Sequence, residues 1–341
     1  MRAAMIDYER KIGITQIPMP EADGTNVIIK LTAAGINGYD TALWELGNLT
    51  KETVPGHEMI GVVVDPGSRS DLKEGDRVTV LPLAACMECE FCKSGRENEC
   101  LKNRNTPGKS KVAFGCFAEY FSARPEFVKK VPDKLSDFEA LMLVPAATAY
   151  HMVKSMNVQK GWKVLITGGG IMGSLIAMWC RYFEAKYIGV VEQNKYRGLL
   201  MMDHGAATRI FDAADPDIVN TLIDAARGFH VHFECSGTAR YINTGILSSR
   251  RGATIATLSL YQKSVPVNFY MMQSKLIKIR PFNAHAISDF DEAVEIIMNN
   301  YKKFNFKRFE YTPVALDDIQ EMMETLTTED HKLEKVVINK F

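Results

Sequence analysis

The pattern of apolar and polar positions divides the chain into two parts. Through residue 150, short apolar runs such as VIIKLTAAGI, MIGVVVDPG, EGDRVTVLP and GCFAEYFSA are separated by Pro and Gly. These runs predict short strands and turns. From residue 160 onward, β-rich runs such as KVLITGGG, KYIGVVE, VHFECSG and ATIATLS alternate with segments of helical length such as IMGSLIAMWCRYFEA. That alternation predicts βαβ units and a parallel sheet.

The last part of the chain returns to mixed structure. DFDEAVEIIMNNYKK has helical spacing, and KLEKVVINKF is typical of a final strand. A chain of 341 residues is longer than a single hydrophobic core usually supports, so two domains are expected. We therefore predict an α/β protein that combines a β-rich domain with a doubly wound parallel-sheet domain.

Composition and charge exclude several classes of partner. Hydrophobic residues make up 46% and charged residues 24%, and 41 basic residues balance 41 acidic ones. A chain without a net positive field is not expected to bind nucleic acid or an anionic membrane. Neither the first 24 residues nor the apolar run LMLVPAATAYHMV resembles a signal peptide or a membrane span. Because seven cysteines suit a reducing compartment, we expect a cytoplasmic protein.

A glycine-rich turn follows the strand predicted at 164–167. Residues 168–173, GGGIMG, fit the pattern G-x-G-x-x-G, and an apolar helix follows them. In such a turn Gly168 permits a tight bend, Gly170 lets the backbone approach a pyrophosphate, and Gly173 allows close helix–strand packing. Backbone N–H groups at the helix start, at Ile171 and Met172, would bind the diphosphate. The pattern predicts a dinucleotide site; a glycine-rich turn without a ligand is the alternative.

The end of the next predicted strand favours one dinucleotide over the other. YIGVVE ends in Glu192, nineteen residues after Gly173. An acid there accepts hydrogen bonds from both adenosine ribose hydroxyls and repels a 2′-phosphate, so NAD is favoured over NADP. Lys195 and Arg197 lie close by in the sequence, and their positive charges weaken the preference for NAD over NADP.

Four cysteines form a compact array in the first part of the chain. CMECEFCKSGRENEC has the spacing C-x2-C-x2-C-x7-C and offers four thiolates from one short loop, Cys86, Cys89, Cys92 and Cys100. Four thiolates suit a tetrahedral Zn²⁺ that has no open position, and such a site is structural. A dithiol redox pair or an iron–sulfur cluster is the alternative.

Taken together, these motifs resemble the medium-chain dehydrogenase/reductase superfamily, the zinc-containing alcohol and polyol dehydrogenases. GHE at 56–58, the cysteine array, GCFAEY at 115–120, TAY at 148–150, the glycine motif and FECSGT at 233–238 carry the resemblance. It implies a GroES-like catalytic domain from residues 1–150 and 283–341, with a Rossmann NAD-binding domain inserted at 151–282. It also implies homodimers or homotetramers, and it places Thr148 against the nicotinamide.

The resemblance breaks where relatives hold a catalytic zinc. Those relatives commonly take ligands from Cys in G-I-C-G-T-D, from His in GHE, and from Cys or an acid ahead of TAY. The corresponding positions here are Asn37, His57 and the apolar run LMLVP at 141–145. Because an amide is a poor zinc ligand and an apolar side chain is none, we predict that this zinc is absent. A weak site built from His57, Glu58 and Asp40 is the alternative.

Without that ion, side chains must handle the substrate proton. Tyr39 replaces the hydroxyl residue that relays the alcohol proton in those relatives, and we expect it to donate or accept the proton while His57 and Asp40 tune or relay. Asn37 and Glu58 complete the candidate catalytic set. Each residue also has a structural alternative. Tyr39 would only line the pocket, His57 would be a buried, hydrogen-bonded histidine, and Glu58 would be a partner in a structural ion pair.

The function that these observations favour is an NAD(H)-dependent oxidoreductase. It would transfer hydride between the nicotinamide and a secondary alcohol or the matching ketone. The resemblance to polyol dehydrogenases implies that this substrate is a sugar, polyol or cyclitol. Quinone and enoyl reductases of the same superfamily carry Asn at the first ligand position. Resemblance to them implies the alternative function, reduction of an activated double bond. A non-catalytic NAD-binding protein is the third.

Overall fold

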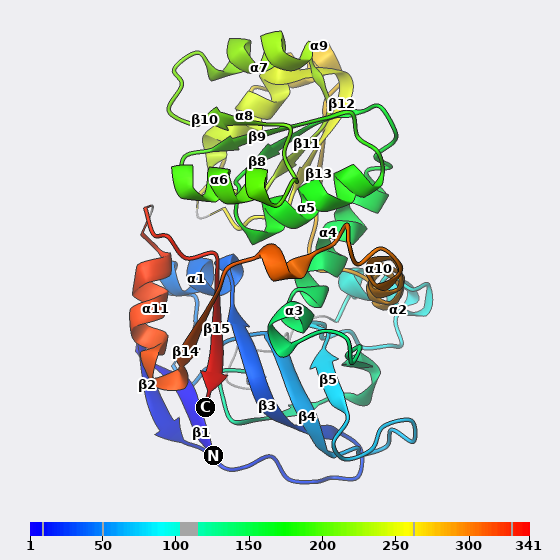
Figure 1. The fold of residues 1–341 in the computed structure, drawn as a ribbon, viewed down its shortest axis with the longest axis vertical. Coiled ribbons are helices and arrows are strands. Elements are labelled where there is room, and N and C mark those ends of the chain that lie inside the picture. Colours follow the sequence, from blue (N-terminus) through cyan, green and yellow to red (C-terminus); the bar gives the residue numbers. More distant parts are fainter. Residues whose placement is uncertain (9, 50, 103–114, 262, 329) are drawn as a thin grey trace. The chain divides into compact units, whose positions relative to one another are not determined.

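Two structural units share the chain, and each contains its own sheet (Figure 1). The computed structural model describes residues 1–341 except 9, 50, 103–114, 262 and 329. The first unit comprises Met1–Val144, Ala284–Phe290 and Glu310–Phe341, and the second comprises Pro145–Asn283 and Asp291–Phe309. Each unit is described by itself below.

The first unit contains a seven-stranded sheet and a two-stranded hairpin. In the sheet the strand order is β14-β15-β3-β4-β5-β7, and β6 also pairs with β3. Its pairs are antiparallel except β14 with β15. The strands of this unit are β1 (Arg2–Tyr8), β2 (Lys11–Gln16), β3 (Val27–Ile36), β4 (Glu58–Asp65), β5 (Arg77–Val80), β6 (Tyr120–Ala123), β7 (Val128–Lys130), β14 (Tyr311–Ala315) and β15 (Lys335–Lys340).

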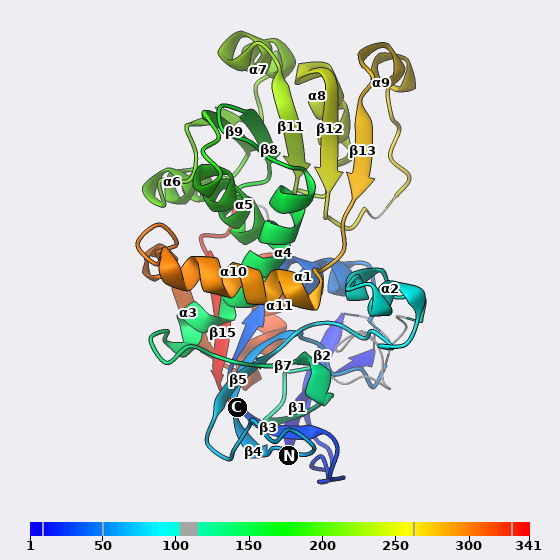
Figure 2. The same cartoon turned by 90° about the vertical axis from the view of Figure 1, so that its right-hand side faces the viewer.

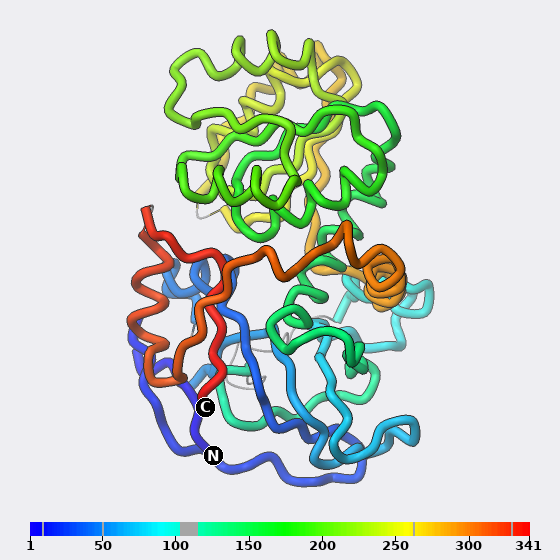
Figure 3. Tube along the Cα trace, in the orientation of Figure 1, coloured from blue at the N-terminus to red at the C-terminus, as the bar shows by residue number. Residues whose placement is uncertain are grey.

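The C-terminal strand lies within this sheet, against β3. Val337 of β15 pairs with Gly35, and Gly35 pairs on its other side with Glu58 of β4. The red end of the tube therefore runs beside the blue N-terminal strands (Figure 3). The run Val336–Ile338 is buried, which explains why an apolar strand closes the sequence.

Short helices complete the first unit. Several begin with a side-chain cap: Ser136 forms a capping box with Glu139 at α3, and Asn37 forms one with Asp40 at α1. The helical segments are α1 (Gly38–Glu45), α2 (Glu90–Lys93), η1 (Glu97–Glu99), η2 (Pro125–Phe127), α3 (Asp137–Leu141), η4 (Leu316–Asp318) and α11 (Ile319–Leu326), together with the start of α10.

The second unit is a doubly wound fold around a parallel six-stranded sheet, seen in Figure 2. The strand order is β10-β9-β8-β11-β12-β13, and every pair is parallel. Its strands are β8 (Lys163–Thr167), β9 (Tyr187–Glu192), β10 (Arg209–Asp212), β11 (Phe229–Glu234), β12 (Ser249–Thr257) and β13 (Lys278–Pro281). Its helices are α4 (Leu143–Ser155), α5 (Ile171–Tyr182), α6 (Lys195–Asp203), α7 (Ile218–Ala226), α8 (Ala239–Ser248), α9 (Phe269–Lys275) and most of α10 (Ile287–Asn299), followed by η3 (Phe306–Arg308).

Helices pack on both faces of this sheet, which is why apolar residues of its central strands are buried on both sides. Leu165 of β8 shares a buried cluster with Phe211 and with Leu222 of α7. The next residue, Ile166, points to the opposite face, where it approaches α5 at Gly173. Successive residues of a strand thus serve opposite faces, as its period of two requires.

One aromatic cluster moves the expected domain boundary. Trp179 of α5 is fully buried, donates its indole N–H to Ala146 O at 2.8 Å, and packs on Tyr150 and Phe304 at centroid distances of 4.7 and 4.4 Å. This packing joins residues 145–150 and 291–309 to the second unit. The division predicted from the sequence gave both segments to the first domain; the aromatic contacts explain the difference.

The predicted fold class is confirmed. The final strand is β15, and the helical spacing near residue 290 corresponds to α10. The apolar run at 141–153 forms parts of α3 and α4, not a membrane span; among the described residues no helix is both long and apolar enough to cross a bilayer.

Candidate active site

The start of α1 fixes the orientation of the Asn37 amide. Asn37 caps the helix, and its Oδ1 accepts hydrogen bonds from the backbone N–H of Tyr39 at 2.9 Å and of Asp40 at 3.1 Å. Asp40 returns the contact by accepting the N–H of Asn37 at 3.1 Å. Because only the oxygen of an amide accepts hydrogen bonds, the Asn37 nitrogen must face the other way.

That nitrogen donates to both neighbours in the GHE segment. Asn37 Nδ2 lies 2.9 Å from His57 Nε2 and 2.8 Å from Glu58 Oε1. With an N–H aimed at it, His57 Nε2 is the acceptor, so the neutral imidazole carries its proton on Nδ1. Nδ1 lies 3.1 Å from Asp40 Oδ1 and donates to it. One amide therefore determines the tautomer of the histidine.

Glu58 completes this network with a buried ion pair. Its Oε2 accepts a hydrogen bond from Lys335 Nζ, and the Lys335 side chain is only 1% exposed. The reading of Glu58 as an ion-pair partner thus agrees with the structure. Lys335 was not among the residues singled out from the sequence. The available signal was a lysine directly before the apolar run 336–338 of the final strand, KVVINK.

Two further side chains border the network. The half-buried Tyr39 packs edge-on against the His57 imidazole, with the ring centroids 5.7 Å apart and the planes at 89°. Cys116 is fully buried, and its thiol donates to Glu58 O at 3.4 Å. Burial raises the pKa of the Cys116 thiol, and the nearby carboxylates of Asp40 and Glu58 raise it further. The structure therefore brings together the whole candidate catalytic set, with Cys116 as a neutral packed thiol beside it.

The four predicted metal-binding cysteines converge. Their sulfur atoms all lie within 4.8 Å of one another, with separations of 3.5 Å for Cys89–Cys92, 3.9 Å for Cys86–Cys92 and 4.0 Å for Cys89–Cys100. A tetrahedral ion with Zn–S bonds of about 2.3 Å needs edges of about 3.8 Å. Among the described residues this is the only group of three or more His, Cys, Asp or Glu side chains close enough to share an ion.

Backbone N–H groups prepare this loop for thiolates. Cys86 N donates to Cys100 Sγ at 3.2 Å, and Cys89 N donates to Cys86 Sγ at 3.3 Å. Backbone N–H groups from Cys92 and Leu101 lower the pKa of the Cys89 thiol to about 6. Burial raises the pKa of Cys92 to about 12, a cost that bonding to a cation would offset.

The glycine motif forms the turn between β8 and α5. Gly168 has a φ of +94°, and a Cβ there would lie 2.9 Å from the Cys235 carbonyl carbon. A Cβ at Gly173 would lie 2.0 Å from Gly168 O, whereas a Cβ at Gly170 would meet no atom within 4 Å. The first and last glycines are therefore required by the fold. The middle one leaves open space at the start of α5, where Ile171 and Met172 lie.

Glu192 links the next strand to this turn. It ends β9, is buried, and accepts hydrogen bonds from Gly169 N and, at 2.7 Å, from Asn194 N. Asn194 caps α6 by accepting the N–H of Arg197 at 3.2 Å. Glu192 is thus held at the glycine turn, and Arg197 lies in the first turn of α6. Thr148 lies half-buried on α4.

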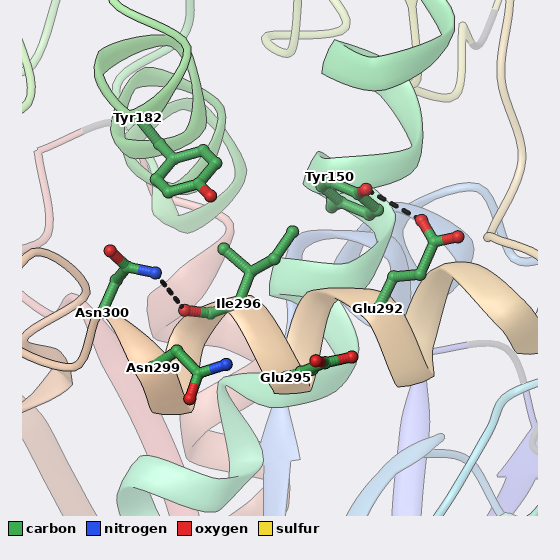
Figure 4. Close-up of a pocket in the computed structure, with 7 residues that line it drawn as sticks. All are labelled: Tyr150, Tyr182, Glu292, Glu295, Ile296, Asn299 and Asn300. Carbon is green, nitrogen blue, oxygen red and sulfur yellow. Dashed lines mark hydrogen bonds between the residues drawn. The ribbon is translucent and has the colours of Figure 1, made fainter.

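A hollow lies on the second unit, away from the glycine turn. It measures about 270 Å³ and lies between α4, α5 and α10. Figure 4 shows the rings of Tyr150 and Tyr182 above α10, with Tyr150 donating to Glu292 at 2.8 Å. None of the residues predicted to act in catalysis or to bind cofactor lines it.

The comparisons with known proteins give the family. Residues 23–133 match the alcohol dehydrogenase GroES-like domain, and residues 172–299 match the zinc-binding dehydrogenase family. L-threonine 3-dehydrogenase of Shewanella sp. (strain MR-7) is 31% identical, over 74% of this chain and 75% of that protein. Sorbitol dehydrogenase of Bacillus subtilis (strain 168) is 28% identical, over 99% of this chain and 97% of that protein. The chain belongs to the zinc-binding dehydrogenase family and is an alcohol dehydrogenase-like oxidoreductase.

Solved structures show the same fold. An Escherichia coli oxidoreductase/dehydrogenase of unknown specificity superposes with a TM-score of 0.91 at 24% identity, covering 100% of this chain and 99% of the other. The 2R,3R-butanediol dehydrogenase of Bacillus subtilis gives a TM-score of 0.86 at 24% identity, with the same coverage. These structures show the fold, and the family matches and relatives given above confirm the predicted superfamily.

The cysteine cluster allows a direct test. Cys89→Ser removes one of four thiolates, and we expect the metal content to fall by about tenfold or more because a hydroxyl is a weak ligand. Metal analysis of the purified chain measures this. Ser94→Ala, in the same loop, is the control and should leave the content unchanged. Equal metal content in Cys89→Ser and wild type would contradict the four-thiolate site.

Proposed function

We propose that this protein is an NAD(H)-dependent dehydrogenase that interconverts a secondary alcohol, of a sugar, polyol or cyclitol, and the matching ketone. The bound nicotinamide supplies or accepts the hydride. Family membership supports the reaction class, and the names of the relatives, which include sorbitol dehydrogenase and L-threonine 3-dehydrogenase, support a polar alcohol. The observation that carries the proposal is the hydrogen-bond network from Asp40 through His57 and Asn37 to Glu58.

The glycine turn supports the cofactor assignment. Gly170 leaves an open space at the start of α5, where backbone N–H groups and the helix dipole favour a diphosphate. Glu192 is already placed at this turn by its hydrogen bonds to Gly169 and Asn194. A carboxylate there suits the two ribose hydroxyls of NAD and repels the 2′-phosphate of NADP.

Two glycine variants separate cofactor binding from folding. Gly170→Ala fills the open space, and we expect NADH to bind about tenfold more weakly while the melting temperature stays the same. Gly173→Ala places a Cβ 2.0 Å from Gly168 O and should lower the melting temperature by several degrees. NADH fluorescence and thermal unfolding measure the two effects. Unchanged NADH affinity in Gly170→Ala would contradict the diphosphate site.

The residues around His57 do not fit the family's catalytic zinc. The Nε2 lone pair that would bind the metal accepts a hydrogen bond from Asn37 Nδ2 at 2.9 Å. That amide cannot turn its oxygen toward a metal without breaking its hydrogen bonds to Tyr39 N and Asp40 N. Leu141 and Val144, in the region of the third ligand, are buried and apolar. We assign zinc to the four thiolates alone.

Zinc content tests this assignment. We expect about one zinc per chain, and His57→Ala should not change that number because the imidazole lone pair is used by Asn37. Atomic emission on dialysed, active protein is the measurement. Two zinc ions per chain that fall to one in His57→Ala would contradict it.

Side chains then handle the substrate proton. During alcohol oxidation, loss of hydride from the carbinol carbon must be accompanied by transfer of the hydroxyl proton to a base. In our proposal the phenol of Tyr39 exchanges that proton with the substrate oxygen. The adjacent His57 imidazole has both nitrogens engaged, Nδ1–H by Asp40 and Nε2 by Asn37, and it tunes the phenol through its edge-on contact with the Tyr39 ring. In ketone reduction the same phenol donates the proton.

One observation favours a second candidate. Asn37 at the first ligand position is compatible with reduction of an activated C=C bond, in which hydride adds to carbon and no alkoxide needs a metal. Oxidation of NADH with a panel of polar ketones and a matched panel of enones separates the two. Turnover of enones alone would favour the second candidate, and tight NADH binding without any turnover would favour a non-catalytic role.

Tyr39→Phe tests the proton donor. It removes only the hydroxyl, and we expect kcat to fall by about 10²-fold or more with NADH affinity within about twofold of wild type. Steady-state kinetics and NADH fluorescence measure both. Tyr8→Phe, an exposed tyrosine of β1, is the matched control. Wild-type kcat in Tyr39→Phe would rule out the phenol and leave Tyr39 as a wall of the site.

A further inference from the structure

Lys335 is the only buried lysine or arginine in the described part of the chain. Its ammonium contacts Glu58 Oε2 and lies 3.5 Å from Ile36 O. Removing both members of an ion pair from water costs about as much as their attraction returns, so a buried pair is weak evidence for stability. Its position beside the network around His57 gives a more specific reason for its presence.

The backbone is shaped to admit this pair. Glu58 of β4 and Lys335 of β15 come from strands on opposite sides of β3, and Gly35 of β3 lies between them. A Cβ on Gly35 would lie 2.8 Å from Lys335 Nζ and 2.9 Å from Glu58 Oε2. The two side chains therefore meet across the one position of the central strand that has no side chain.

Glu58 connects the ammonium to the site through its two oxygens. Oε2 contacts Lys335, and Oε1 accepts the Asn37 amide at 2.8 Å. The same amide nitrogen donates to His57 Nε2. The lysine thus lies one carboxylate and one amide away from the imidazole, with no substrate contact required.

The charges around His57 show what the lysine changes. Within the first unit, Asp40 accepts from the imidazole and the Tyr39 ring packs edge-on against it. The Glu58 carboxylate lies one amide away, and the Glu58 carbonyl accepts from the thiol of Cys116. An anion near an imidazole favours the protonated ring, so each of these carboxylates acts on His57 in the same direction and a cation acts in the opposite one. Lys335 cancels one of those charges in a region where water screens little.

We propose that Lys335 is a positioning residue: its fixed charge holds Glu58 on Asn37 and sets the acidity of His57. The effect on turnover rests on the proposed dehydrogenase function, whereas the effect on His57 does not. Gly35 belongs to the same device, because it makes room for the pair.

The test is a cycle of four proteins: wild type, Lys335→Met, Glu58→Gln and the double variant. The readout is the pKa of His57 from its ring signals in NMR, assigned by comparison with His57→Asn. Lys335→Met removes a cation and should raise that pKa by about half a unit or more. Glu58→Gln removes an anion but keeps an acceptor for Asn37, and should lower it. In the double variant the pKa of His57 should lie close to its wild-type value, because one cation and one anion are removed together.

Controls separate this role from a structural one. Lys340→Met makes the same change at an exposed position of β15 and should leave the pKa of His57 unchanged. If Lys335→Met does not fold, Glu58→Gln can be compared with the double variant, since the two differ only by the cation. The pKa of His57 should then be higher in the double variant. A pKa of His57 that is the same in all folded variants, or that moves in one direction in both single variants, overturns the proposal.

Turnover provides a second, separable readout. Where the wild type turns over a ketone, Lys335→Met should lower kcat by about tenfold and move its pH profile upward, with NADH affinity unchanged. If no substrate is turned over by any protein while the opposite shifts of His57 are seen, the proposed function fails and the positioning role stands. If ketones are turned over but the pH profile of kcat does not shift in Lys335→Met, the proposed function stands and the positioning role fails.

Discussion

The candidate active site depends on the hydrogen bonds of one group, the side-chain amide of Asn37. Its oxygen is held by the first turn of α1, so its two N–H groups have fixed directions, one toward His57 Nε2 and one toward Glu58. A helix cap is a local feature, but here it determines which nitrogen of a histidine carries the proton. Because the cap would be lost if the amide turned, the arrangement is stabilised by the fold and by the site together.

This constraint changes the chemistry that the scaffold can perform. A metal ion on an imidazole would need the lone pair that the amide uses, and it would bring positive charge to a region already lined by carboxylates. In this chain the positive charge is instead a lysine ammonium, separated from the imidazole by Glu58 and Asn37. The ammonium contacts Glu58 and Ile36 O, so in our proposal it sets the charge around His57 and does not bind the substrate oxygen. In our proposal the substrate proton therefore moves through the phenol of Tyr39, which packs on the His57 ring.

Much of the fold followed from the sequence, because its signals are local. The strand–glycine–helix pattern at 164–182 and the four cysteines within fifteen residues each placed their residues correctly before any tertiary contact was known. Asn37, Tyr39, Asp40 and His57 could be collected because they belong to two short motifs. Lys335 could not, since it reaches Glu58 from a strand 277 positions away, and only the strand order β4-β3-β15 brings the two together. The boundary near residue 145 was missed for a similar reason, because it depends on the packing of Trp179 and Phe304.

The measurement that tests the central claim most directly is anomalous diffraction at the zinc absorption edge, from crystals grown with added zinc and NADH. The amide that occupies the His57 lone pair predicts one strong peak per chain, enclosed by the four thiols, and no peak within bonding distance of His57 Nε2. A second ordered peak on that nitrogen, with Asn37 turned away, would contradict the account.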